Sequence, residues 1–551
     1  MLERDCNMEL ALQNCTIGKV IEDKAKKYGD RTFLTYVPDG RTYSYRDLDI
    51  LSTRIANGLV EIGIGEGVHV AVIMENCPEQ FLLYLALGKI GAVSVPINTS
   101  ARGRQLGHLL NLSDATTLVT ETGLLDSFDR EVLPATAVKR LLVLGGIEEA
   151  RALVPADGDI GLFDFAELAS GSETPIESTA RFCDVAFLAY TSGTTGPSKL
   201  NVFPHAHCIL YALNNAEEHD YRDTDVAYVC LPMFHISALF GVTFAALLAG
   251  GTVVMTRRFS RTAFWDDIRG FGVTLINSLG AMSEFIWNQP PSPEDRNHKI
   301  RLCRMVPVPR FAAQFEDRFG LRIVSGYGLS DFGQVAAFTA RDPREKLGSP
   351  GRPRRGIELR IVDEDDLDVA PGSVGEIVVR TKTPWNMAQG YYKMPEATLA
   401  AMRNMWFHTG DCGYLDAEGY LYFTHRKKDA MRRRGENISA VEVEQIILEH
   451  PAVLDAAVYA VRAESSEDEV AATIVLRDKA DVSERELIEH CVRNMAYYMV
   501  PRYIRFATDL PRTLSHRVQK FKLIEDANAD LSVFFDREKE GIVVGRKKAA
   551  G

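Results

Sequence analysis

The stretch from Tyr190 to Lys199 constrains this chain more than any other feature. It reads Tyr-Thr-Ser-Gly-Thr-Thr-Gly-Pro-Ser-Lys, and the apolar run 185–190 before it predicts a buried strand. Gly193 and Gly196 permit positive φ, so that successive backbone N–H groups can converge on an anion. Further donors to phosphate oxygens come from Thr191, Ser192, Thr194, Thr195 and Lys199. The stretch therefore predicts a loop that holds the phosphates of a nucleotide.

This loop is not a Walker loop, in which four residues separate the last two glycines. Here two residues separate Gly193 from Gly196, and Lys199 is followed by Leu200 rather than Ser or Thr. Clusters of Gly, Ser and Thr also mark ordinary flexible turns from a strand to a helix. Composition alone leaves that alternative open, so the remaining motifs must decide.

The size and charge of the chain exclude several classes of protein. A chain of 551 residues exceeds the size of one hydrophobic core, so more than one domain is expected. A net charge of −12 argues against nonspecific nucleic-acid binding. Nine dispersed cysteines without a Cys-x-x-Cys pair suggest reduced thiols in a cytoplasmic protein. The polar residues 1–9 predict no signal peptide, and no apolar run is long enough for a membrane span.

The hydrophobic pattern predicts an α/β protein with two domains. A strand at 69–74, a helix at 78–90 and a strand at 92–95 predict a crossover in a mostly parallel sheet. Beyond residue 348 the pattern changes to strands, at 357–362 and 375–380, which predict a β-rich subdomain. We place a domain boundary at Asp429, between a large N-terminal domain (1–428) and a small, mobile α+β domain (429–551).

The phosphate-binding stretch resembles that of the adenylate-forming (ANL) superfamily, which includes acyl- and aryl-CoA synthetases, luciferases and peptide-loading adenylation domains. The resemblance extends over residues 16–522. It implies that ATP and Mg²⁺ convert a carboxylic acid into an acyl-AMP, and that coenzyme A then displaces AMP to give a thioester. The substrates implied are thus a carboxylic acid or acyl-adenylate, ATP/AMP and coenzyme A.

Two further motifs resemble the nucleotide-binding motifs of that family. In residues 327–331, Tyr-Gly-Leu-Ser-Asp, the resemblance assigns adenine stacking to Tyr327, the α-phosphate to Ser330 and Mg²⁺ to Asp331, and it places Gly328 among the nucleotide-binding residues. The family usually has Glu at the last position, so the shorter Asp331 makes direct ligation doubtful. In residues 406–411, Trp-Phe-His-Thr-Gly-Asp, it assigns the ribose hydroxyls to Asp411. Arg426 is implied to reach ribose or phosphate.

Three positions resemble residues with which the family controls its second step. His235 matches the gate of the acyl pocket, although a lone His is often a core residue. Asp429 matches the hinge about which the C-terminal domain rotates. Gly435 would let the pantetheine arm of coenzyme A pass close to the backbone. Arg433 belongs to the charge run 432–434, which is either a solvated face or a contact to a CoA phosphate.

The chain departs from the family at the loop that serves adenylation. Where the family has Gly-Lys, this chain has His516-Arg517, and Leu200 replaces the glycine after the phosphate-loop lysine. An Arg is not an equivalent donor to Lys at a tight site. Either Arg517 substitutes for the lysine, or the enzyme accepts acyl-AMP from a separate adenylating enzyme. The second interpretation is similar to the specialised synthetases of platensimycin-type diterpenoid pathways.

The sequence leaves the acyl group and the acceptor open. The predicted pocket wall, which includes 280–282 and 333–335, has small and apolar residues, which suits a bulky apolar acid. An amide-forming or carrier-loading enzyme of the same superfamily is one alternative, and an inactive acyl-AMP-binding protein is another. The oligomeric state is also open, and a homodimer is compatible with the sequence.

Overall fold

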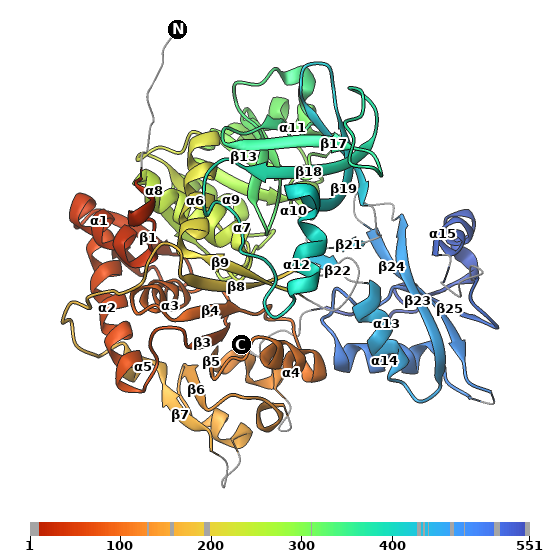
Figure 1. Cartoon of the computed structure of the whole chain (residues 1–551), viewed down its shortest axis with the longest axis horizontal. Coiled ribbons are helices and arrows are strands. Elements are labelled where there is room, and N and C mark those ends of the chain that lie inside the picture. The colour runs from red at the N-terminus through yellow and green to blue at the C-terminus, as the bar shows by residue number, and fades with distance from the viewer. Residues whose placement is uncertain are drawn as a thin grey trace.

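The computed structural model describes residues 10–128, 132–154, 159–191, 199–309, 311–426, 431–433, 436–438, 440–462, 468–478, 480–511, 518 and 520–545. Figure 1 shows a large N-terminal part, coloured red to cyan, beside a small C-terminal part in blue. The fold is the predicted α/β arrangement of several sheets with a smaller C-terminal domain, so the predicted fold class is confirmed.

The first large sheet carries one side of the site. Its strands, in spatial order, are β7 (Gly161–Asp164), β6 (Arg140–Leu144), β5 (Thr117–Glu121), β3 (His69–Ile73), β4 (Val93–Pro96), β8 (Val185–Thr191) and β9 (Lys199–Pro204). The strands pair in parallel from β7 to β8, as the strand–helix–strand pattern predicted, and only β8 and β9 pair antiparallel. The phosphate-binding stretch therefore joins two strands of one hairpin, not a strand to a helix.

The second large sheet carries the opposite side. Its order is β16 (Arg352–Pro353), β15 (Gly333–Phe338), β14 (Arg322–Leu329), β13 (Leu302–Val306), β12 (Leu275–Leu279), β10 (Val226–Val229), β11 (Thr252–Met255), β1 (Thr32–Tyr36) and β2 (Thr42–Ser44). The pairs from β14 to β1 are parallel, and the antiparallel pairs lie at the two edges.

Helices fill the space between the two sheets and cover their outer faces. The largest hydrophobic cluster joins β1, β3 and β11 to α1, α2, α3, α6 and α8, so both sheets share one core. Separate clusters cover the outer faces. The α-helices of this part are α1 (Ile17–Tyr28), α2 (Tyr45–Glu61), α3 (Pro78–Lys89), α4 (Gly103–Leu112), α5 (Phe165–Leu168), α6 (His205–Glu218), α7 (Ile236–Ala238), α8 (Ala245–Ala249), α9 (Phe264–Gly270), α10 (Gly280–Trp287), α11 (Ala312–Phe319) and α12 (Pro395–Ala401).

Short helices complete the connections of the N-terminal part. A π-helical segment, η5 (Leu239–Phe244), links α7 to α8. The 3₁₀ helices are η1 (Leu12–Asn14), η2 (Thr122–Ser127), η3 (Leu133–Ala135), η4 (Glu149–Leu153), η6 (Pro293–Arg296), η7 (Arg344–Lys346) and η8 (Arg403–Met405).

The β-rich subdomain and the C-terminal domain complete the chain. The subdomain is an antiparallel sheet of β17 (Ile357–Val362), β18 (Gly375–Thr381), β19 (Phe407–Leu415) and β20 (Leu421–Arg426). The C-terminal domain has the hairpin β21 (Met431–Arg433) and β22 (Glu436–Ile438), the helices α13 (Ala440–Leu448), α14 (Glu484–Asn494) and α15 (Lys520–Ala529), and η9 (Leu531–Val533). Its sheet orders β23 (Val453–Arg462), β24 (Asp468–Leu476), β25 (Tyr503–Ala507) and β26 (Phe535–Asp536).

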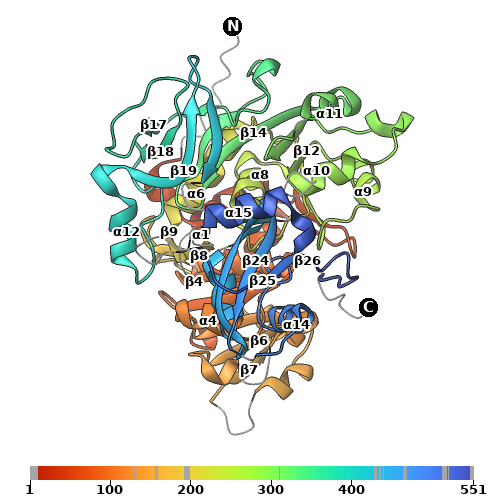
Figure 2. The same cartoon turned by 90° about the vertical axis from the view of Figure 1, so that its right-hand side faces the viewer.

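The C-terminal domain rests on α4 of the N-terminal domain, where α4 and α14 are in contact (Figures 1 and 2). Gln105 in α4 donates to Glu442 of α13 at 3.0 Å, and Asn98 donates to the hydroxyl of Tyr498 at 3.2 Å. Arg104 forms an ion pair with Glu449 at 3.0 Å. These polar contacts fix one orientation of the two domains.

Candidate active site

The ends of the predicted phosphate loop are paired with each other. Thr191 is the last residue of β8 and lies opposite Lys199, the first residue of β9. This pairing closes the intervening stretch into the connection of a hairpin. The remaining predicted phosphate contacts lie outside the described residues: Ser192, Gly193, Thr194, Thr195 and Gly196.

Lys199 and Asp331 lie in one polar cluster with Tyr391, a residue that the sequence analysis did not single out. The Lys199 ammonium lies 4.3 Å from the centroid of the Tyr391 ring, a cation–π distance. The Tyr391 backbone segment is held on β9, since Tyr392 N donates to Leu200 O at 2.8 Å. Burial raises the pKa of Asp331, while the Tyr391 hydroxyl and the charge of Lys199 act in the opposite direction.

Asp331 fits a magnesium ion only as a single ligand. No cluster of three or more His, Cys, Asp or Glu side chains suited to a metal occurs in the part of the chain that the structure describes. Magnesium at phosphate sites often takes one or two carboxylates, with phosphates and water completing the octahedron. A ligand must be ionised, and the raised pKa of Asp331 opposes this until a cation compensates its charge.

Tyr327 and Asp411, which are far apart in sequence, meet at the predicted nucleoside site. The Tyr327 hydroxyl donates to Asp411 Oδ2 at 2.8 Å, and the Asp411 side chain is buried. In the ladder between β19 and β20, Asp411 lies opposite Arg426. The structure thus brings together three of the residues that the sequence assigned to adenine and ribose, although it does not describe the Arg426 side chain.

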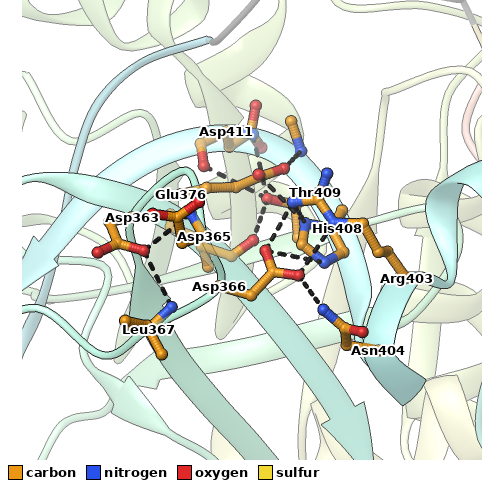
Figure 3. Close-up of polar contacts among 12 residues, drawn as sticks. Asp363, Asp365, Asp366, Leu367, Glu376, Arg403, Asn404, His408, Thr409 and Asp411 are labelled. Atoms are coloured by element: carbon orange, nitrogen blue, oxygen red, sulfur yellow. Dashed lines mark hydrogen bonds and ion pairs between the residues drawn. The ribbon is translucent and has the colours of Figure 1, made fainter.

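A network of polar contacts holds the turn that presents Asp411 (Figure 3). Glu376 of β18 accepts hydrogen bonds from Gly410 N at 3.2 Å and from His408 Nδ1 at 3.1 Å. Gly410 has a φ of +71°, which few residues other than glycine adopt readily. Thr409 Oγ1 accepts from Asp411 N at 3.1 Å. Glu376 was missed by the sequence analysis, although a carboxylate directly before the apolar run 377–379 was a signal.

The network continues to the turn that contains Asp366. The Asp366 carboxylate accepts from Arg403 Nη2 at 2.6 Å and lies 3.8 Å from His408 Nε2. The His408 imidazole therefore lies between two carboxylates, those of Asp366 and Glu376 (Figure 3). Charged side chains of the subdomain thus hold the ribose motif in place.

Gly328 and Ser330 lie in the β14–β15 hairpin beside Tyr327. A Cβ atom on Gly328 would lie 2.4 Å from Gly333 O, so only glycine fits this approach of two strands. The carbonyl of Ser330 lies 3.3 Å from Nε2 of the buried His207. The phosphate contact assigned to the Ser330 hydroxyl stays a prediction.

His235 contacts the C-terminal domain. It precedes α7, and its Nε2 donates to Glu436 Oε1 at 3.0 Å. Glu436 begins β22, directly after Gly435. The hairpin that carries the predicted CoA-facing loop therefore reaches the predicted acyl gate. Gly435 itself, Asp429 and Arg517 lie outside the described residues.

Arg433 contradicts both predictions made for it. It is 1% exposed, so it is not part of a solvated face, and its guanidinium is not available to a CoA phosphate. Nη1 donates to the carbonyls of Tyr498 and Val500 at 3.3 and 3.2 Å, and Nε pairs with Glu469 at 2.8 Å. The physical reason is the alternation of a strand, because Met431 and Arg433 of β21 both point into the domain. Arg433 therefore has a structural role.

The residues of the predicted acyl-pocket wall that the structure describes are mostly buried. Met282 and Val335 pack into hydrophobic cores. Gln334, by contrast, is a buried polar side chain that lies 3.2 Å from His219 Nε2. The role of these residues as the wall of the acyl pocket stays a prediction.

Comparisons with known proteins cover most of the chain. Residues 21–392 match the family model described as AMP-binding enzyme, and residues 442–517 match the model described as AMP-binding enzyme C-terminal domain. The chain is similar to the crotonobetaine/carnitine–CoA ligase of Salmonella agona (strain SL483), with 32% identity over 91% of this chain and 97% of that protein.

Solved structures of similar proteins have the same fold. A double mutant of the o-succinylbenzoate CoA synthetase of Bacillus subtilis, bound with a product analogue, matches with a TM-score of 0.78, 27% identity, and coverage of 92% of this chain and 98% of that one. The amide bond synthetase McbA of Marinactinospora thermotolerans matches with a TM-score of 0.79, 26% identity, and coverage of 93% and 99%. In the described part of this chain, no helix has the length and apolar character that crossing a membrane requires.

Proposed function

Since this chain belongs to the AMP-binding enzyme family, we propose that it forms acyl-CoA thioesters and is more competent in the thioester step than in adenylation. Its similarity to CoA ligases indicates that the chain is a CoA ligase. The expected nucleotide is ATP or AMP, and the expected thiol is coenzyme A.

The contact between His235 and Glu436 is the observation that carries the proposal. Thioester formation requires that the CoA-facing loop of the C-terminal domain approach the acyl-AMP bound in the N-terminal domain. Gly435 adjoins Glu436, so a contact of Glu436 with the predicted gate supports that arrangement. Gln105, Asn98 and Arg104 support the same orientation from α4.

In the proposed step, the sulfur of coenzyme A bonds to the acyl carbon, and the bond from that carbon to the phosphate oxygen of AMP breaks. The thiol proton passes to solvent, and AMP leaves with the electron pair. We assign the leaving phosphate to the stretch from Thr191 to Lys199, and the ribose to Asp411 with Tyr327. We assign the rotation between the two half-reactions to Asp429.

The weakness in adenylation is proposed from His516 and Arg517. Adenylation brings the substrate carboxylate close to the α-phosphate, where a compact cation is needed. Arg517 is larger and forked, and His516 adds a side chain where the family has none. When bound, a magnesium ion at Asp331 would neutralise phosphate charge. A separate adenylating enzyme would then supply the acyl-AMP.

Amide formation is a second candidate, because the chain is structurally similar to an amide bond synthetase. Synthetic acyl-AMP incubated with coenzyme A or with an amine separates the candidates. We expect a thioester and free AMP with coenzyme A, and no amide above the uncatalysed background. An amide formed faster than the thioester would favour the second candidate. Binding of acyl-AMP without any product would indicate an inactive protein.

A further inference from the structure

Arg304 is a charged residue in the middle of a strand that is otherwise buried. It lies on β13, where its neighbours Cys303 and Met305 point into the hydrophobic cluster that includes α9, α10 and α11. Because side chains alternate along a strand, Arg304 points to the opposite face, toward α6 and α7. A basic residue at such a position usually pairs with a counter-charge in the protein or in a ligand.

Protein groups do not neutralise the Arg304 guanidinium. Nη1 donates to the hydroxyl of Ser237 over a long distance, 3.4 Å, and Nε is buried without a hydrogen-bond acceptor. Across the described ranges, no carboxylate lies within ion-pair distance of Arg304. Arg304 is half-buried and its Nε is fully buried, so part of the guanidinium has lost its contact with water without gaining a counter-charge.

Three buried polar atoms of residues linked to one another through His219 and Tyr211, with His219 close enough to Arg304 to feel its charge, also have no hydrogen-bond partner in the described structure. These are Gln334 Oε1, Asn215 Oδ1 and His219 Nδ1. Burial and the nearby charge of Arg304 lower the pKa of His219 to about 3, so this imidazole is neutral. Unpaired buried polar atoms are rare in folded proteins, and several in one place need an explanation.

This polar cluster adjoins the proposed active site. Ser237 follows His235 by two residues, and Gln334 follows Asp331 by three. The ring of Tyr211 in α6 packs against Gly241 and Gly333, where an added Cβ would lie 3.4 and 2.6 Å from ring atoms. The cluster therefore contacts the two segments that directly follow His235 and Asp331 in the chain.

We propose that Arg304 binds an oxygen function at the far end of the acyl group, remote from the carboxyl carbon that forms the thioester. This inference rests on the proposed function. Arg304 supplies charged N–H donors, while Gln334 and Asn215 supply acceptors. A hydroxyl satisfies both, since it accepts from Arg304 and donates to an amide oxygen. A carboxylate is attracted by the charge of Arg304, but it has no proton to donate to the amide oxygens of Gln334 and Asn215.

The test uses synthetic acyl-AMPs, so that it does not depend on adenylation. Chains of six to twelve carbons, each ending in a methyl, a hydroxymethyl or a carboxylate group, are compared by kcat/KM for thioester formation with coenzyme A. We expect an oxygenated end to be preferred over methyl by roughly tenfold to hundredfold, the scale of a hydrogen bond to a charged group. Whether hydroxyl or carboxylate is preferred identifies the natural end group.

Arg304→Met keeps an unbranched apolar stem and removes the charge and the N–H donors. We expect this variant to lose the preference and to accept methyl-ended chains better than the parent enzyme does. Arg301→Met is the matched control, because Arg301 lies just before β13 and pairs with Asp225. Arg301→Met should lower stability without changing the preference for oxygenated chain ends. A loss of that preference in Arg304→Met can then not be attributed to lowered stability.

The outcomes separate this inference from the proposed function. If no acyl-AMP of the panel forms a thioester with coenzyme A, the proposed function fails. If methyl-ended chains react as well as oxygenated ones, or if Arg304→Met retains the preference, the function stands and the assignment of Arg304 is wrong.

Discussion

Replacing Glu436 by Gln tests whether the observed domain orientation serves thioester formation. Glutamine keeps the size of the side chain and its ability to accept from His235, but removes the charge. The Glu436 side chain is 15% exposed and that of His235 is 41% exposed, so the contact is partly screened by water. A charge-assisted hydrogen bond contributes about 1.5–3 kcal/mol and an exposed pair about 0–1 kcal/mol. We therefore expect a loss of about 1 kcal/mol, or about fivefold in rate.

The assay is single-turnover thioester formation from synthetic acyl-AMP, with AMP affinity measured separately by calorimetry. Glu436→Gln should slow thioester formation and leave the affinity for AMP unchanged. Arg104→Ala is the matched control, because its pair with Glu449 also crosses the domains but is far more exposed, and we expect less than a twofold effect. The double variant with His235→Ala should be no slower than His235→Ala alone. Additive losses would refute the idea that the two side chains act as a pair.

The remaining predictions concern the nucleoside site, the C-terminal domain and acid stability. Asp411→Ala should weaken AMP binding but hardly affect a 2′,3′-dideoxy nucleotide, and calorimetry showing equal losses would contradict the ribose assignment. Arg433→Met should lower the free energy of unfolding by about 3 kcal/mol without changing CoA affinity at a temperature where it is folded; a selective loss of CoA affinity would restore the discarded role. Burial lowers the pKa of His205 to about 4, so the unfolded state binds more protons between about pH 6.5 and 4. His205 alone should contribute a fall in stability of about 3 kcal/mol over that range, and His205→Gln should remove this contribution in pH-resolved denaturation.

The hydrophobic pattern predicted the elements of the fold well. The helix predicted at 78–90 is α3 (Pro78–Lys89), and the strand predicted at 69–74 is β3 (His69–Ile73). These predictions succeeded because each element buries side chains at its own period. The connection after β8 was harder to predict, since glycines and hydroxyls do not distinguish a turn to a helix from a turn to a strand.

Contacts between distant parts of the chain were beyond sequence reasoning. Nothing in the spacing of His235 and Glu436, which are 201 residues apart, predicted that they meet. Arg433 and Arg304 show a different difficulty. Arg433 occupies a buried position of β21, where the period of two would have placed it inside, but its charge suggested the surface. Arg304 is half-buried on β13, and the sequence drew no attention to it.

The central claim is tested most directly by measuring the two half-reactions of the unmodified enzyme separately. We predict slow or undetectable acid-dependent pyrophosphate exchange, together with ready thioester formation from synthetic acyl-AMP and coenzyme A. Restoring the family residues with His516→Gly and Arg517→Lys should raise the exchange by up to about 10²–10³-fold, the scale of one preorganised contact. Brisk exchange by the unmodified enzyme across a panel of carboxylic acids would contradict the account and indicate an ordinary two-step ligase.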